Sequence, residues 1–223
     1  MTAPRRTYYD HEAAYQRIAA TGGTGWDDLF QGEQDSYLAL DGFLASSFAP
    51  PHARVIDLGC GGGQATRKLA ARGYAVIGID FAATAIELAR ANVIDDRVQF
   101  VVGDCLELAA FDDGAFDLAI DNHVLHCLLG ADRGRFLREV ARVLRPGGLL
   151  FSETMSREAE LDLDALNIDP DTFISRHGNR YWTTRAELDR DFDGAGFEVL
   201  ERGARGNAPG EGRDLITYAR RRP

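Results

Sequence analysis

Short apolar runs alternate with segments of helical periodicity through the central part of the chain. The first run includes Val55 and Ile56 and leads into a glycine-rich turn. Further runs cover residues 74–80, 98–103 and 115–120. Short apolar runs bounded by glycine, proline or acidic residues are typical of buried β-strands. The pattern therefore predicts four strands in this region.

Helix-forming segments are interspersed with these strands. They cover residues 64–72, 82–93 and 131–144, where apolar residues recur at helical spacing. Asp132 is expected to cap the last of these helices, and Pro146 follows its end. Strands that alternate with helices predict an α/β protein with a doubly wound, mostly parallel sheet.

The C-terminal part of the chain adds three strands, at residues 149–151, 197–200 and 215–219, so the predicted sheet has seven strands. A helix that includes Leu188 precedes the sixth strand and ends at glycines. The acid-rich segment 155–180 departs from the alternation. It is expected to form either a solvated loop with a short helix or an insertion on the substrate side of the sheet.

Residues 1–50 precede the first strand and are expected to form an N-terminal helical segment, with helices at 8–20 and 35–48. Two prolines then end the second helix. The remaining residues, 51–223, are expected to form the rest of a single globular domain.

Composition and charge narrow the classes of function. The chain has 223 residues, of which 45% are hydrophobic and 27% charged, as in globular proteins. It has neither an apolar run of about 18 residues nor an apolar signal core, which predicts a cytoplasmic protein without a membrane partner. The net charge of −10 argues against a nucleic-acid partner. The oligomeric state is not predicted.

The glycine turn and the acidic residues point to a ligand site. Gly59 and Gly61–Gly63 lie between a strand and a helix, where backbone N–H groups can approach a ligand. Asp80 ends the next strand, 23 positions after Asp57, close to the spacing of about 20 for a ribose-binding carboxylate. The following strands end at Asp104 and Asp121. Such strand ends form the edge at which open α/β sheets bind ligands.

Five motifs in this order resemble the class I S-adenosylmethionine-dependent methyltransferases. They are the turn 57–63, Asp80, the pair Gly103-Asp104, the segment 116–121 and the turn 143–148. The resemblance covers residues 52–154 and extends more loosely to the C-terminus. It implies a Rossmann-like methyltransferase fold whose last strand lies antiparallel beside the fifth strand. It also implies S-adenosylmethionine as the cofactor and S-adenosylhomocysteine as its product.

The resemblance also assigns roles to single residues. Asp57 and the glycine turn are implied to hold the methionine end, Asp80 the ribose and Asp104 the adenine amino group. Phe81 and Cys105 line the adenine slot, and Asp121 and Asn122 lie next to the methyl group. The whole implied cofactor set is Asp57, Gly59, Cys60, Gly61, Gln64, Asp80, Phe81, Asp104, Cys105, Asp121, Asn122 and Tyr15.

In similar methyltransferases the N-terminal segment packs over the cofactor as a lid. Four aromatic residues of this chain suit such a lid: Tyr8, Tyr9, Tyr15 and Trp26. The alternative is that these side chains only anchor the helices to the sheet.

Two histidines are candidate general bases. His123 and His126 follow the fourth strand three residues apart, so on a helix they would share a face. Imidazole titrates near neutral pH, which suits removal of a proton from a hydroxyl or amine. The alternative is that they are packing or surface residues. A metal cluster with Asp121 and Cys127 is disfavoured, and the cysteines form no CxxC pair, so no metal is expected.

The predicted function is methyl transfer to an oxygen or nitrogen of a small molecule. The fourth strand lacks the Asn/Asp-Pro-Pro-Tyr/Phe motif of DNA amino-methyltransferases and reads Asp121-Asn-His-Val124 instead. Two alternatives stay open: a non-catalytic adenosylmethionine-binding protein and a nicotinamide-dependent dehydrogenase. The sequence identifies neither the acceptor nor the methylated atom.

Overall fold

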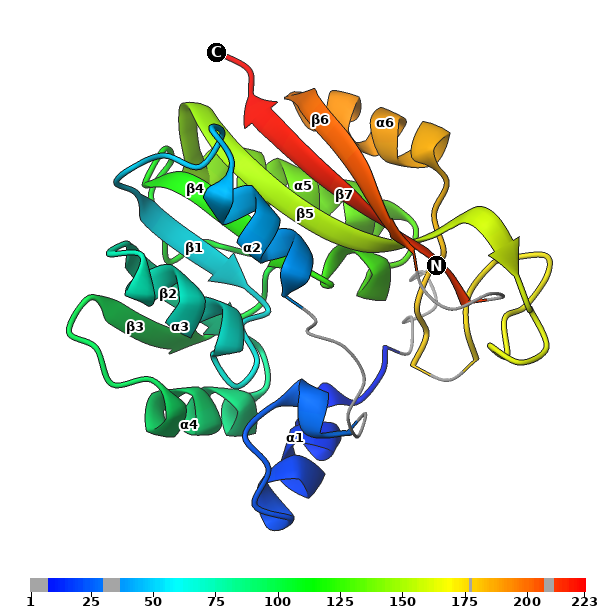
Figure 1. Cartoon of the computed structure of the whole chain (residues 1–223), viewed down its shortest axis with the longest axis horizontal. Helices are drawn as coiled ribbons and strands as arrows, with labels where there is room; N and C mark the ends of the chain where they lie inside the picture. The colour runs from blue at the N-terminus through cyan, green and yellow to red at the C-terminus, as the bar shows by residue number, and fades with distance from the viewer. Residues whose placement is uncertain (1–7, 30–36, 177, 207–210) are drawn as a thin grey trace, which may run out of the picture.

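The computed structural model describes residues 8–29, 37–176, 178–206 and 211–223. Its centre is a seven-stranded sheet in the order β3-β2-β1-β4-β5-β7-β6 (Figure 1). Strand β7 is antiparallel to both of its neighbours, and the other neighbouring pairs are parallel. The strands are β1 (Arg54–Leu58), β2 (Ala75–Asp80), β3 (Val98–Val102), β4 (Phe116–Asn122), β5 (Leu144–Leu161), β6 (Phe197–Gly206) and β7 (Glu211–Arg221).

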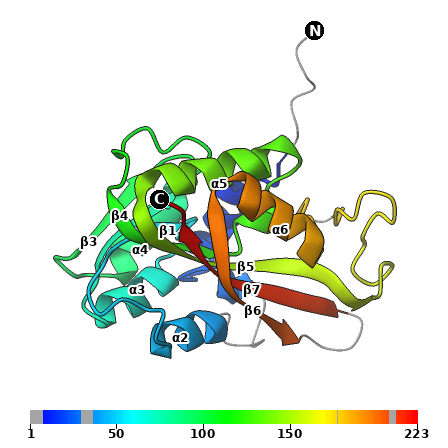
Figure 2. The same ribbon diagram turned by 90° about the horizontal axis from the view of Figure 1, so that it is seen from above.

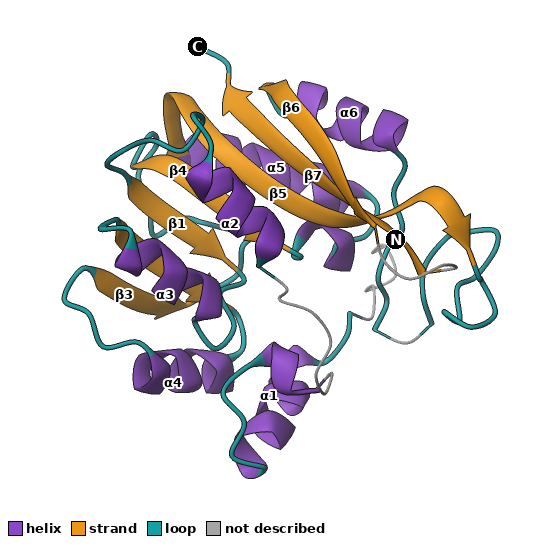
Figure 3. Ribbon diagram, in the orientation of Figure 1, coloured by secondary structure: helices purple, strands orange, loops and turns teal. Residues whose placement is uncertain are grey.

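Helices cover both faces of this sheet (Figures 2 and 3). One face carries α2 (Leu38–Ala45) and α3 (Gln64–Ala71), and the other carries α5 (Ala131–Val143) and α6 (Arg185–Gly194). Helix α4 (Ala83–Asn92) packs along β2 and β3.

Beyond the carboxyl ends of the parallel strands lie α1 (His11–Ala20) and the short 3₁₀ helix η1 (Trp26–Leu29). A second 3₁₀ helix, η2 (Leu125–Cys127), follows β4. No helix among the described residues combines the length and apolar character needed to cross a bilayer.

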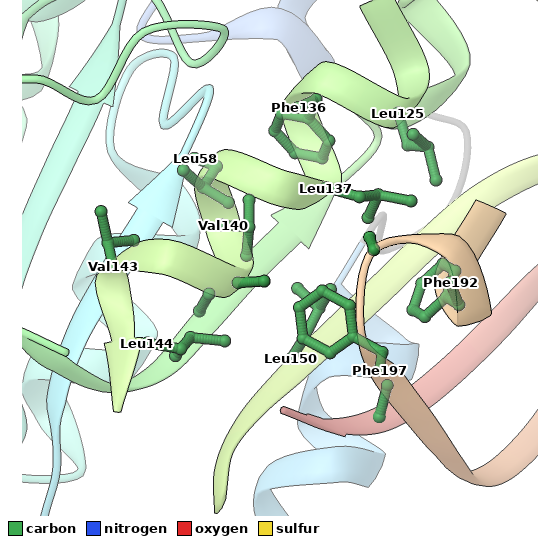
Figure 4. Close-up of a cluster of buried hydrophobic side chains, with 14 of the residues drawn as sticks. Leu58, Leu125, Phe136, Leu137, Val140, Val143, Leu144, Leu150, Phe192 and Phe197 are labelled. Carbon is green, nitrogen blue, oxygen red and sulfur yellow. The ribbon is translucent and has the colours of Figure 1, made fainter. Parts of the chain in front are cut away.

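The apolar stripe of α5 builds the largest part of the core. Phe136, Leu137 and Val140 are fully buried and belong to one cluster with Phe192 of α6 and Phe197 of β6 (Figure 4). Burying a side chain of this size contributes about 1.5–3 kcal/mol, so this cluster holds α5 and α6 on the sheet. The sheet edge that carries the site is thereby fixed in place.

The α/β class, the mostly parallel seven-stranded sheet and the antiparallel last strand are confirmed. The capping of α5 was predicted wrongly. Its N-cap is Gly130, with φ of 53°, and Asp132 lies inside the first turn. The Asp132 carboxylate accepts a hydrogen bond from the hydroxyl of Tyr8 instead of capping the helix.

Other boundaries also differ from the prediction, and α1 begins at His11 rather than at residue 8. The last three strands are longer than predicted, and β5 continues into the acid-rich segment as far as Leu161. Helix α2 ends at Ala45 rather than at residue 48. At this end the Ser46 hydroxyl donates to the carbonyl of Phe43 at 2.7 Å. Its predicted start, residues 35 and 36, lies outside the described residues.

The short helix expected within residues 155–180 is absent from the described part of that segment. Turns and two isolated bridges, Ile168–Ser175 and Ile174–Tyr181, take its place. The Asp162 and Asp169 carboxylates each accept backbone N–H groups two or three residues ahead. Such bonds compete with helix formation, which explains the turns.

Candidate active site

The turn after β1 contains three glycines in left-handed backbone conformations. Gly59, Gly61 and Gly63 have φ of 62°, 53° and 86°, a region that side chains disfavour. A Cβ atom at Gly61 would collide with the hydroxyl of Tyr15, and one at Gly59 with the side chain of Val124. The turn is therefore a cradle in which neither Gly59 nor Gly61 leaves room for a side chain.

Asp80 joins this cradle to the neighbouring strand. Its Oδ2 atom accepts the N–H of Gly61 at 3.0 Å, and its Oδ1 atom accepts the N–H of Ala82 at 2.9 Å. Burial raises the pKa of this carboxyl, while the two backbone N–H groups oppose that rise. The carboxylate thus lies at the end of β2, beside the glycine turn, as a ribose-binding role requires.

Asp57 is buried beneath the start of α3. Its Oδ2 atom accepts a 2.5 Å hydrogen bond from the hydroxyl of Thr66. Burial raises the pKa of Asp57 to about 7, and the bond from Thr66 opposes that rise. Burial also raises the pKa of the Cys60 and Cys105 thiols, so both thiols are protonated near neutral pH.

The residues implied for the adenine slot gather next to Asp80. Phe81 is 53% exposed, an unusual state for a phenyl ring, and follows Asp80 directly. The backbone N–H of Gly103 donates to the carbonyl of Asp80 at 2.9 Å, which brings Asp104 and Cys105 to the same edge. Asp104 is exposed. An apolar ring and an exposed carboxylate suit a purine with an amino group.

At the end of β4, the carboxylate of Asp121 accepts hydrogen bonds from within the protein. It is fully buried, and its oxygens accept the Ser152 hydroxyl at 2.6 Å and the N–H groups of Val124 and Leu125 at 2.8 and 3.2 Å. Its neighbour Asn122 has a buried Oδ1 atom without a hydrogen-bond partner among the described residues. Asp121 therefore shapes the turn after β4, and Asn122 offers a free acceptor at the edge.

The two histidines do not lie on an α-helix, the arrangement in which they would share a face. His123 has a φ of 77°, and His126 belongs to the 3₁₀ helix η2. Their ring centroids are still only 5.2 Å apart. His126 is buried, and burial, followed by the charge of His123, lowers its pKa well below the usual value. His123 keeps 24% of its side chain exposed.

Three charged residues of this edge were not predicted as site residues. Glu153 of β5 is fully buried, forms an ion pair with Arg205 of β6 and lies 3.8 Å from the His123 ring, while Arg205 also pairs with Asp214 of β7. The position of Glu153 at the end of the fifth strand was visible in the sequence. Its partners were not, because the pairing of β5, β7 and β6 brings them together.

The N-terminal segment packs onto α4 next to the cradle. Tyr15 and Ile18 form an apolar cluster with Ala82 and Ala85. Gln64, at the start of α3, lies against Gly25 of the same segment. The segment thus covers the cradle from the side, whereas α2 packs on the face of the sheet.

A cation–π contact links this segment to the one after β5. The guanidinium of Arg180 lies 5.6 Å from the ring of Trp26, which in turn lies 5.8 Å from the ring of Tyr15. Contacts of this kind contribute about 0.5–2 kcal/mol. Two segments from either side of the edge therefore meet above it. Closure of this lid over a cofactor stays a prediction.

The geometry fits S-adenosylmethionine better than a nicotinamide cofactor. The cradle admits no Cβ atom at Gly61, Asp80 offers carboxylate oxygens at the neighbouring strand end, and Phe81 offers an exposed ring. A nicotinamide-binding Rossmann sheet has the strand order 3-2-1-4-5-6. Here an antiparallel β7 lies between β5 and β6, which argues against the dehydrogenase alternative.

Solved structures of related fold agree with this architecture. The 1,6-didemethyltoxoflavin-N1-methyltransferase of Burkholderia thailandensis, solved with 1,6-didemethyltoxoflavin and S-adenosylhomocysteine, superposes with a TM-score of 0.74 at 21% identity. That alignment covers 100% of this chain and 94% of that one. The cyclase SpnF gives a TM-score of 0.70 at 20% identity, over 97% of this chain and 98% of its own. At these identities the likeness concerns the fold.

Sequence comparison finds methyltransferase relatives. The family model described as "Methyltransferase domain" matches residues 56–152. The ubiquinone biosynthesis O-methyltransferase of Xanthomonas campestris pv. campestris is 33% identical over 153 residues, which are 66% of this chain and 62% of that protein. The chain thus spans less than two thirds of the length of these curated relatives. Residues 56–152 therefore match a methyltransferase domain, and with the glycine turn and the strand order the chain is similar to the class I S-adenosylmethionine-dependent methyltransferases.

Proposed function

We propose that the protein transfers a methyl group from S-adenosylmethionine to an oxygen or nitrogen atom of a small molecule. The observation that carries the proposal is the position of Asp80, which joins the end of β2 to the glycine cradle through the N–H of Gly61. This is the place of a ribose-binding carboxylate in a nucleotide-binding α/β sheet.

The other residues of the edge have complementary roles in this proposal. Phe81 and Cys105 line the adenine slot, Asp104 faces the adenine amino group, and Tyr15 closes the cradle at Gly61. When bound, S-adenosylmethionine supplies a methyl group that is already activated. The protein's task is then to orient the acceptor, exclude water and remove a proton where the acceptor carries one.

His123 is the better of the two candidate bases. It is partly exposed at the end of β4, where an acceptor can reach it. His126 is buried, and its lowered pKa disfavours the uptake of a proton, which is what a general base must do. In this proposal His123 takes the acceptor's proton on its ring, and His126 packs beside it as a neutral ring.

A small-molecule acceptor agrees with the relatives. One is named an O-methyltransferase of ubiquinone biosynthesis, and another an N1-methyltransferase of 1,6-didemethyltoxoflavin. The acidic chain is a poor match for a phosphate backbone. The acceptor proposed here is therefore a small molecule with a hydroxyl or an amine, and the predicted location is the cytoplasm.

A second candidate, adenosylmethionine binding without methyl transfer, has one observation in its favour. SpnF has the same fold and is named a cyclase, so the fold alone does not require methyl transfer. Turnover separates the two candidates.

The test has two stages. Calorimetric titration should show binding of S-adenosylhomocysteine and none of NAD; preferential binding of NAD would overturn the cofactor assignment. Phenols and amines are then screened for uptake of a labelled methyl group from S-adenosylmethionine. Transfer to at least one acceptor is expected. Tight adenosylhomocysteine binding without transfer to any acceptor would favour the second candidate.

A further inference from the structure

The backbone of His123 is held in a conformation that residues other than glycine rarely adopt. Its φ is 77°, and strain of this kind concentrates at functional sites. The N–H of His123 donates to the carbonyl of Glu153 at 3.1 Å, and Asp121 accepts the N–H of Val124. These bonds on either side fix the His123 backbone at the junction of β4 and β5.

Strand register places three charged side chains on one face of the sheet. Glu153 is opposite Ile216 on β7, Asp214 lies two residues from Ile216, and Arg205 of β6 is opposite Asp214. Residues directly opposite each other, or two apart on one strand, share a face. Arg205 accordingly donates to Glu153 Oε1 at 2.9 Å and to Asp214 Oδ2 at 2.8 Å.

The second carboxylate oxygen of Glu153 is left for His123. Glu153 is fully buried, and its Oε2 atom has no hydrogen-bond partner among the described residues. That atom lies 3.8 Å from Nε2 of His123. A buried acceptor without a partner is costly, so a donor is expected to reach it. The imidazole of His123 is a suitable donor, because a neutral imidazole carries one N–H group.

The groups around Glu153 act on its pKa in opposite directions. Burial raises the pKa of Glu153, and His123 and Arg205 lower it again, whereas Asp214 adds to the rise. His123, Glu153 and Asp214 have ligand-type atoms within 4.8 Å of one another, but the positive charge among them is already supplied by Arg205. His126, Asp121 and Cys127 are further titratable groups next to His123.

We propose that Glu153 positions the base His123. Its Oε2 atom holds the proton of neutral His123 on Nε2, so that Nδ1 takes up the proton of the methyl acceptor. The inference rests on the proposed function. Nδ1 of His123 makes no hydrogen bond to any residue that the structure describes. The acceptor's O–H or N–H proton moves to Nδ1, and its bonding electrons stay on the acceptor atom. The resulting imidazolium faces the Glu153 carboxylate, which balances its charge.

The first test reads the tautomer without any turnover. Nitrogen-15 NMR of the full chain, with S-adenosylhomocysteine present, should show neutral His123 protonated on Nε2. In Glu153→Leu, which removes the acceptor, this preference should fall at least several-fold. Glu187→Gln is the matched control, because it changes a glutamate that pairs with Arg157 at 2.7 Å and belongs to the capping box of α6. A proton on Nδ1 in the unaltered protein, or a preference that survives Glu153→Leu, overturns the proposal.

The second test uses a double-mutant cycle on an acceptor found by the methyl-transfer screen. Glu153→Gln should lower kcat about 10²-fold with little change in KM, and Glu187→Gln should change neither. In a His123→Gln background, the further substitution Glu153→Gln should have almost no effect, because Glu153 acts through His123. Additive losses overturn the proposal, as does a stoichiometric divalent metal bound at His123 in the purified protein.

The two tests separate this inference from the proposed function. If no acceptor is methylated, the proposed function fails, and the tautomer experiment still decides whether Glu153 positions His123. If the tautomer result is negative while methyl transfer proceeds, only this inference fails. Should Glu153→Leu not fold, Glu153→Gln read by the same NMR experiment should still show a measurable shift of the His123 ring nitrogens, and an unchanged spectrum counts against the proposal.

Discussion

The carboxylate of Asp80 and the backbone of Gly61 form a 3.0 Å hydrogen bond between the second strand and the turn after the first. The same carboxylate holds the N–H of Ala82 just before α4. One side chain therefore sets the shape of the cradle and the start of the next helix. In the proposed function the same carboxylate also binds the ribose, so variants of Asp80 must be compared for both cofactor binding and local structure.

Asp80→Ala is expected to weaken S-adenosylhomocysteine binding by about 1–3 kcal/mol, roughly 5- to 150-fold, because the ribose hydroxyls lose their acceptor. Calorimetry measures the loss, and circular dichroism checks that the fold is intact. Asp95→Ala is the matched control, since Asp95 pairs with Arg97 just before β3, at the opposite end of the sheet. Unchanged affinity in a folded Asp80→Ala protein would reject the ribose assignment.

Tyr15→Phe is expected to lower S-adenosylhomocysteine affinity by about 0.5–1.5 kcal/mol with little change in melting temperature, because its hydroxyl lies against Gly61 in the cradle. Tyr74→Phe is the control. Its hydroxyl donates to the carbonyl of Pro50 at 2.6 Å, far from the cradle, so that variant should lose stability and keep its affinity. If the two variants bind S-adenosylhomocysteine with equal affinity, Tyr15 does not belong to the cofactor site.

Deletion of residues 1–30 is a harsher version of the same experiment. It should weaken cofactor binding, and it should also lower stability, because Tyr15 and Ile18 bury apolar surface on α4. The loss of affinity is expected to exceed the loss of stability if this segment is a lid. Binding that survives the deletion unchanged would show that the segment only anchors the helices.

Stability should fall as pH rises through the range in which Asp57 titrates. Its pKa is raised from 3.8 to about 7 in the folded protein, so between those values only the folded state holds the proton. The unfolding free energy therefore decreases with rising pH, by about 4 kcal/mol in all and by about 3 kcal/mol between pH 5 and pH 8. Urea unfolding should be measured at pH 5 and pH 8. The decrease in unfolding free energy between these pH values should be smaller by about 3 kcal/mol in Asp57→Asn than in the unaltered protein. Identical pH dependence in both proteins would contradict the prediction.

His123→Gln and His126→Gln should have different consequences. His123→Gln is expected to reduce turnover about 10²- to 10⁴-fold without loss of cofactor affinity, as removal of a general base does. His126 is buried and neutral, so its replacement should act mainly by lowering the melting temperature. Wild-type turnover in both single variants and in the double variant would leave catalysis to orientation alone.

The parts of the site that follow from local sequence were predictable. The glycine turn, Asp80 and Asp104 are each fixed by the strand that precedes them, so their order along the chain places them on one edge. The helix after the acidic segment also had a readable start, since Thr184 and Glu187 form a capping box.

The charged cluster behind His123 could not be predicted from local sequence. Glu153, Arg205 and Asp214 come from three strands, and only the antiparallel insertion of β7 brings them together. Arg205 lies five residues beyond the predicted end of its strand, so even its secondary structure was missing from the prediction. The left-handed backbone of His123 likewise depends on pairing with β5, which no local pattern encodes.

The place of β7 has a consequence for folding during synthesis. Strands β5 and β6 emerge from the ribosome before the strand that pairs with both of them. Until β7 is made, β5 has an open edge, and β6 has no partner in the sheet. An open apolar edge attracts other chains, so the nascent protein should be most prone to aggregation just before its last strand appears. The Glu153–Arg205–Asp214 cluster forms only at that final step, so the site behind His123 is the last part of the molecule to be assembled.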